Sequence, residues 1–185
     1  MRIFLLASFP SLSPREPAPL SSAEVLSRCA DHLPAADIAE LEALLRDPVT
    51  GNSSFARAWA AFRAQRQERN RFERASRLAP PGAAVLPPPR PDDLYWDRIQ
   101  TAAWDAPDPL AREDALLRED WDWLDEARRA DPYGHADLGG YLLQIRLLER
   151  RGAWDADAGA RAFAEQADAV FSTLLEHLQE TEVSA

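Results

Sequence analysis

The stretch that decides the fold runs from Trp121 to Gly152 and reads WDWLDEARRADPYGHADLGGYLLQIRLLERRG. Apolar residues recur at helical spacing on both sides of a central DPYG sequence, which is typical of a turn. The stretch therefore predicts two amphipathic helices joined by a tight turn. We expect its large side chains to face inward: Trp121, Leu124, Tyr141 and Ile145. We expect the acidic side chains of its first helix to face water or a basic partner: Asp122, Asp125 and Glu126.

The N-terminal part of the chain contains an apolar run and two helix signals. Residues 3–9 (IFLLASF) predict a buried strand or extended segment, with a signal peptide as the alternative. Ser21 and Glu24 form a capping box, which predicts a short helix to about residue 32. Pro34 then opens a second helix that ends before Pro48.

A long third helix is predicted over residues 54–78, where Phe55, Trp59 and Phe62 recur on one face. Beyond Phe62 the segment becomes polar and rich in arginine. We expect this second half to project from the fold, or to pair with an acidic surface in this chain or in a partner. The arginines that we select as partner-binding candidates are Arg63, Arg66 and Arg74.

A proline-rich segment interrupts the helical pattern in the middle of the chain. Residues 87–89 are three consecutive prolines, which favour an extended, semi-rigid spacer. We therefore predict an N-terminal helical part (1–78), a connector (79–92) and a C-terminal helical part (93–185). The alternative is one single domain in which the connector is a long loop.

The C-terminal part continues the all-helical pattern. A short helix is expected from Asp92 to about residue 103, and Asp108 followed by Pro109 is a strong helix start. This second helix should bury one face, formed by Leu110, Leu117, Trp121 and Leu124. A last helix is expected over about residues 155–180. The chain as a whole predicts an all-α, irregular bundle of about six to seven helices.

Charge and composition narrow the classes of partner. The net charge is -10, and all the basic residues are arginine. Residues 1–80 hold eleven arginines against nine acidic residues, whereas residues 81–185 hold ten against twenty-two. An acidic second half argues against nucleic acid and against anionic lipid headgroups as partners. No apolar stretch is long enough to span a membrane, so we expect membrane association only through a partner.

No motif in the sequence carries recognisable catalytic chemistry. Glycine-rich phosphate loops and nucleophile elbows are missing, and Cys29 with His32 lacks further metal ligands at matching spacing. We therefore predict no catalytic, cofactor-binding or metal-binding residue, and no enzyme activity for the isolated chain. The alternative is an enzyme that uses His135 with Asp131, or the carboxylates between residues 119 and 126, for acid–base work.

Two segments of the chain resemble a known family. The opening MRIFLLASFPSLS with PLSSAEVLSRCADHLPAADIAELEALL, and the later LLREDWDWLDEARRADPYGHADLGGYLLQIRLLERRGAWDADAG, resemble a bacterial protein family of uncharacterised function. That family is similar to a shortened form of the C (or d) subunit of V/A-type ATPases. In those ATPases the C (or d) subunit connects the central stalk to the membrane rotor ring. The resemblance implies a non-catalytic, cytoplasmic subunit, peripheral to the inner membrane through a complex that transports protons or sodium ions. Trp121 joins the expected contact residues, because tryptophan is enriched at interface hot spots. The alternative is an acidic α-helical adaptor or chaperone-like module with another partner.

Overall fold

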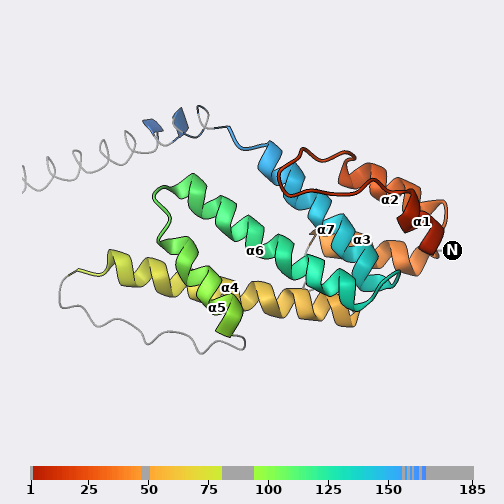
Figure 1. Cartoon of the computed structure of the whole chain (residues 1–185), viewed down its shortest axis with the longest axis horizontal. Helices are drawn as coiled ribbons and strands as arrows, with labels where there is room; N and C mark the ends of the chain where they lie inside the picture. The colour runs from red at the N-terminus through yellow and green to blue at the C-terminus, as the bar shows by residue number, and fades with distance from the viewer. Residues whose placement is uncertain are drawn as a thin grey trace, which may run out of the picture. The chain divides into compact units, whose positions relative to one another are not determined.

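The computed structural model describes residues 2–46, 51–80, 94–155, 157, 159, 161–162 and 164–165. Within these ranges the chain forms seven α-helices and no strand (Figure 1). The helices are α1 (Arg2–Ser8), α2 (Ser22–Ala30), α3 (Ala35–Arg46), α4 (Ser54–Leu78), α5 (Leu94–Trp104), α6 (Pro109–Ala130) and α7 (His135–Gly152). The prediction of an all-α bundle with about six to seven helices is confirmed.

The chain divides into two compact units, Met1–Arg151 and Gly152–Ala185. Helices α4 and α5, which lie on either side of the proline-rich connector, pack against each other within the first unit. The connector that we predicted at 79–92 lies within the span of this unit, and the division into two helical parts stays a prediction. Residues 81–93, and most of the helix expected over 155–180, lie outside the described residues.

Three helices begin where local sequence predicts, because a side chain there accepts a backbone N–H of the first turn. The Ser21 hydroxyl accepts from Glu24 N at 3.2 Å, and the Glu24 carboxylate accepts from Ser21 N at 2.7 Å. Ser53 caps α4 through Ala56 N at 3.0 Å. Asp108 caps α6 through Ala111 N at 2.7 Å. The capping box is confirmed, and so are the expected bounds of α4.

The expectation of a strand or extended segment over residues 3–9 is wrong, because this segment forms α1. Leu5 and Phe9 lie four residues apart and are both buried, and the Phe9 ring stacks on Tyr141 of α7 at 4.9 Å. A strand needs a neighbouring strand for its backbone hydrogen bonds, and the described residues form none. A helix satisfies those groups internally and still buries one face.

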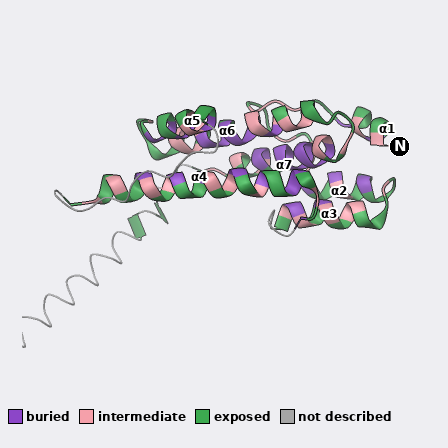
Figure 2. Ribbon diagram, turned by 90° about the horizontal axis from the view of Figure 1, so that it is seen from below, coloured by how far each residue is buried: buried purple, intermediate pink, exposed green. Residues whose placement is uncertain are grey.

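Helix α7 is the most buried helix of the first unit (Figure 2). Tyr141 and Ile145, which we expected to face inward, are buried, and so are Leu138, Leu142 and Leu148. Two consecutive glycines allow this close packing. A Cβ at Gly139 would lie 2.7 Å from Phe55 Cε1 of α4 and 3.0 Å from Leu44 Cδ1 of α3. A Cβ at Gly140 would lie 2.5 Å from Arg128 Cγ of α6, so the pair of glycines lets three helices approach α7.

A second apolar cluster joins α4, α5 and α6 through aromatic rings. Phe62 lies at its centre, 5.1 Å from the Trp123 ring and 5.6 Å from the Trp96 ring. Trp59 adds contacts at 5.5 Å to Phe62 and 5.2 Å to Trp123. The sequence pattern had not selected Trp123 for this interface. Its i−2 neighbour Trp121 is buried as expected, whereas Leu110 is 54% exposed, which corrects the face predicted for α6.

Candidate partner-binding surface

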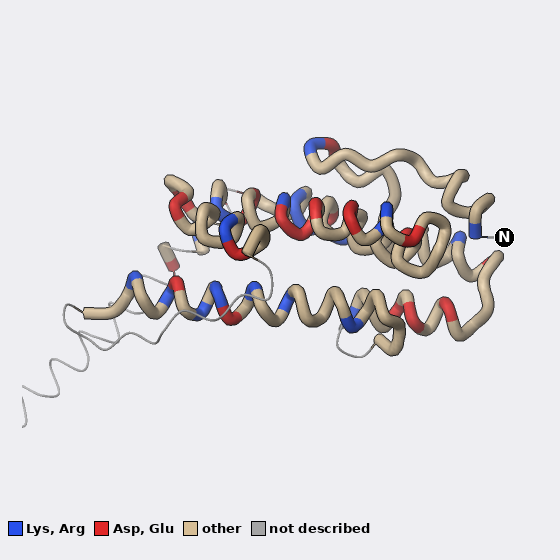
Figure 3. Tube along the Cα trace, turned by 60° about the horizontal axis from the view of Figure 1, so that its bottom comes forward, with Lys and Arg blue, Asp and Glu red and all other residues tan. Residues whose placement is uncertain are grey.

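The arginine-rich half of α4 faces acidic residues of α5 and α6 (Figure 3). Arg66 forms an ion pair with Asp120, and both side chains are buried. Arg69 pairs with Asp97 of α5, and Arg77 pairs with Asp105 at 2.9 Å at the more exposed end. Of the three possibilities that the sequence left open for this half of α4, Arg66, Arg69 and Arg77 therefore use pairing within the chain.

These ion pairs matter because a buried charge is costly when it stands alone. Desolvation of an arginine and a carboxylate is compensated only when the two groups bind each other closely. Around the end of α5 further contacts support the pairing. The Arg112 guanidinium lies 4.4 Å from the Trp104 ring, and Trp104 Nε1 donates to Asn70 Oδ1 at 2.9 Å. Helices α4, α5 and α6 are thus held by polar as well as apolar contacts.

The residues selected from the sequence as partner-binding candidates do not share one surface. Arg66 and Trp121 are buried, so their side chains are occupied by contacts within the first unit. Arg63 is half-buried over the Trp59 ring at 5.6 Å, and burial, followed by the charge of Arg66, lowers its pKa. Arg74 is exposed on α4. Partner binding by this set stays a prediction.

Two of the selected residues, Asp122 and Glu126, line an open groove of about 760 Å³ between α5 and α6. Tyr95 and Trp96 line its other side, and their rings meet edge to face at 4.9 Å. Arg129 completes the lining. Burial raises the pKa of the Asp122 carboxyl, against the opposing effect of a neighbouring arginine. We call these five residues the α5–α6 groove.

The α5–α6 groove combines carboxylate acceptors with aromatic faces, which is a suitable environment for an arginine or lysine side chain. Asp125 lies beside it and pairs with Arg129 at 2.9 Å. Sequence reasoning found the two acidic residues by their outward position on α6 but missed Tyr95, Trp96 and Arg129. Sequence reasoning did not place α5 beside α6, although only residues 105–108 separate the two helices, and a connection of this length favours antiparallel neighbours.

His135 and Asp131, the alternative acid–base pair, each contact other groups in the structure. Asp131 Oδ2 accepts from Ala136 N at 3.1 Å, where it serves the first turn of α7. His135 Nε2 lies instead 3.0 Å from an Arg2 guanidinium nitrogen and 3.7 Å from Asp37 Oδ1. These groups are partly exposed and tie α1 and α3 to α7.

Cys29 is fully buried, and burial raises the pKa of its thiol to about 11. A thiol held neutral in this way is a poor nucleophile and a poor metal ligand. Among the described residues, no three His, Cys, Asp or Glu side chains gather closely enough to hold a metal ion.

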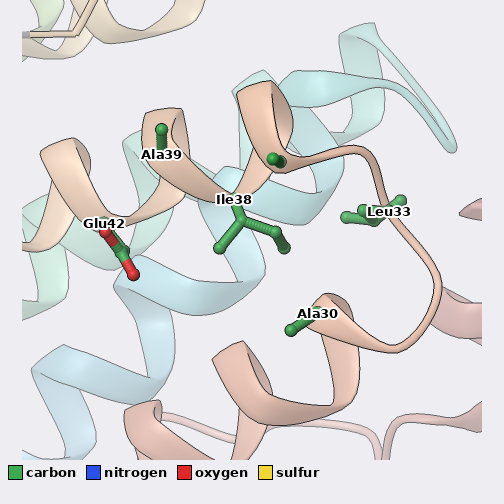
Figure 4. Close-up of a pocket in the computed structure, with 6 residues that line it drawn as sticks. Ala30, Leu33, Ile38, Ala39 and Glu42 are labelled. Atoms are coloured by element: carbon green, nitrogen blue, oxygen red, sulfur yellow. The ribbon is translucent and has the colours of Figure 1, made fainter.

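A smaller pocket of about 360 Å³ lies where α2 ends and α3 begins. Its lining is apolar except for one carboxylate, and consists of Ala30, Leu33, Ala35, Ile38, Ala39 and Glu42. Figure 4 shows Ile38 on α3 pointing toward the end of α2, where Ala30 lies. The only titratable side chain in this lining is the Glu42 carboxyl.

Comparisons with protein-family models, with curated proteins and with solved structures find no match to this chain. None of the helices in the described ranges is both long and apolar enough to cross a membrane.

Proposed function

We propose that this chain is a non-catalytic coupling subunit associated with a V/A-type rotary ATPase that transports protons or sodium ions. The resemblance in sequence motivates the choice of machine. The observation that supports a contact role is the α5–α6 groove, which presents Asp122, Glu126 and Tyr95 on packed helices. A coupling subunit needs a stable shape and a specific surface rather than a reaction centre.

In this proposal the occupant of the α5–α6 groove is a basic segment of a central-stalk or rotor-ring subunit. Asp122 and Glu126 are four residues apart on α6, so both carboxylates are available to one approaching guanidinium or ammonium group. Charge attraction of this kind guides association and weakens as salt screens it. The protein would be cytoplasmic and peripheral to the inner membrane through this complex.

The test is purification of the native ATPase at moderate salt from cells that carry the wild-type chain or one variant. We expect the wild type to copurify with the ATPase, and Glu126→Arg to be lost from it. The matched control is Glu68→Arg, which makes the same charge change at an exposed position on α4 and should copurify normally. If the wild type never accompanies the ATPase, the proposal fails. If Glu126→Arg binds like the wild type, the α5–α6 groove is not the contact.

The second candidate is an acidic α-helical adaptor or chaperone-like module with another partner. The same groove supports it, because carboxylates beside aromatic rings accept a basic segment from any protein. The two candidates differ in what deletion of the gene does. Loss of ATPase assembly or of ion pumping favours the coupling subunit, whereas normal assembly and normal pumping favour the adaptor.

A further inference from the structure

Glu119 on α6 and Gln100 on α5 form a fully buried side-chain pair between two helices. Gln100 Nε2 donates a hydrogen bond to Glu119 Oε1 at 2.6 Å. The remaining oxygens of the two groups, Gln100 Oε1 and Glu119 Oε2, are also buried and have no hydrogen-bond partner among the described residues. Two buried acceptor oxygens in the same contact therefore lack a donor.

A single proton satisfies both atoms. A neutral carboxylic acid has one O–H donor, whereas a carboxylate has only acceptors. When Glu119 Oε2 carries the proton, it can donate to Gln100 Oε1 while Gln100 Nε2 donates to Glu119 Oε1. When Glu119 is ionised, a charge and two unpaired oxygens are buried, and both are costly.

We propose that Glu119 is a buried proton-binding residue, kept neutral against Gln100, and that its ionisation weakens the packing of α5 on α6 as pH rises. The inference does not depend on the proposed function, because it concerns only the contact between these two helices. It assigns a role to a side chain that neither the α5–α6 groove nor the arginine ion pairs use.

The charged groups that act on the Glu119 carboxyl are Arg66 on α4 and Asp120 on α6. Helix α5 contributes Asp97, three residues before Gln100. Arg66 favours an ionised Glu119, but it is ion-paired with Asp120, whose own charge opposes ionisation. Arg69 and Asp97 likewise pair with each other. Burial is the largest influence and raises the pKa of the Glu119 carboxyl to about 7, against the effects of Gln100 and Arg66.

The direction of the pH dependence follows from linkage. In the unfolded chain the carboxyl loses its proton near its ordinary pKa of 4.5, whereas in the folded chain it keeps the proton up to about pH 7. The stabilisation that the proton on Glu119 contributes to the fold is therefore fully present below pH 4.5 and is lost as pH rises to about 7. Above that pH the stability no longer changes with the titration of this group. Within that window the ratio of folded to unfolded protein falls about tenfold per pH unit from this group alone.

The test compares thermal unfolding of the full chain with that of Glu119→Gln between about pH 4 and pH 8. Glutamine keeps an N–H donor at this position at every pH. We expect the difference in thermal unfolding midpoint, variant minus wild type, to increase between about pH 4.5 and pH 7 and then to level off. Glu126→Gln, an exposed substitution on the same helix, should follow the wild-type profile. Parallel profiles for Glu119→Gln and the wild type would overturn the proposal.

A spectroscopic measurement on the wild-type chain makes the test independent of how well the variant folds. Infrared difference spectra, or carboxyl-carbon NMR, should show a protonated carboxyl at about pH 6 that disappears by about pH 8. The same signal should be missing from Glu119→Gln. If the wild-type spectrum shows an ionised Glu119 at pH 6, the proposal is wrong.

Discussion

Two regions of the first unit are packed by different means. Helix α7 packs mainly through aliphatic and aromatic side chains and through Gly139 and Gly140, with polar contacts at Gln144 and Glu149. Helices α4, α5 and α6 also share aromatic rings, but between them lie buried arginines, carboxylates and an amide. The packing of α7 depends chiefly on shape and buried area, whereas the packing of α4, α5 and α6 depends also on each buried charge keeping its partner.

Because they are packed differently, the two regions should respond differently to amino-acid substitution. Apolar packing loses stability in proportion to the volume that is removed or forced in. A buried ion pair contributes little net stability when intact but becomes costly when one member is removed. Substitutions in each region separate these two behaviours.

The largest effect is expected for Asp120→Ala, which leaves Arg66 buried without its carboxylate. We expect a loss of about 3–5 kcal/mol in the free energy of unfolding, measured by chemical denaturation. The double substitution Arg66→Met with Asp120→Leu removes both charges and should recover most of this loss. A double variant as unstable as Asp120→Ala would show that the region depends on the ion pair itself.

The next effect tests the apolar region. Gly139→Ala places a methyl group 2.7 Å from Phe55 Cε1, so the ring or the helix must shift. Overpacking of this kind costs about 1–3 kcal/mol and outweighs the gain in helix propensity of about 1 kcal/mol. Gly152→Ala is the matched control, because a Cβ there meets no described atom within 4 Å. Equal unfolding midpoints for the two variants would contradict the close approach at α7.

A smaller effect is expected where α7 meets α2 through a polar contact. The Glu149 carboxylate accepts from Ser22 N at 2.6 Å and from Ser22 Oγ at 3.0 Å, so it satisfies the first turn of α2. Glu149→Ala should lower the free energy of unfolding by about 1 kcal/mol. Hydrogen exchange should increase at the start of α2 first. Exchange that increases equally in every helix would indicate a different origin for the loss.

The smallest effect is expected for a surface ion pair. Asp125 and Arg129 lie 2.9 Å apart, but both side chains are substantially exposed, so water and salt screen the contact. Asp125→Ala should change the free energy of unfolding by less than about 0.5 kcal/mol. A loss as large as that of Asp120→Ala would erase the distinction between buried and exposed pairs on α6.

Prediction from sequence was most accurate where a structural feature depends on residues a few positions apart in the chain. Ser53 and Asp108 begin α4 and α6 because a capping side chain reaches only three residues along the chain. It worked less well at α1, where an apolar run is compatible with either a strand or a helix until its neighbours are known. It failed at Leu110, which lies in the first turn of α6 and remains exposed.

The candidate site shows the same division. The outward position of Asp122 and Glu126 follows from the 3.6-residue period of α6, so it could be predicted. Tyr95, on the opposite side of the groove, comes from another helix, and its position depends on how α5 packs on α6.

Local sequence was therefore sufficient for the helical class, for the caps and for the buried stripe of α7, because hydrogen bonds and periodicity act over a few residues. The pairing of Arg66 with Asp120, 54 positions apart, and of Gln100 with Glu119 required the folded chain. A charge on a helix face is compatible with water, with a partner or with an internal counter-charge. Only the packing of α4, α5 and α6 selects the internal partner, because this packing removes water from the arginine and from the carboxylate at the same time.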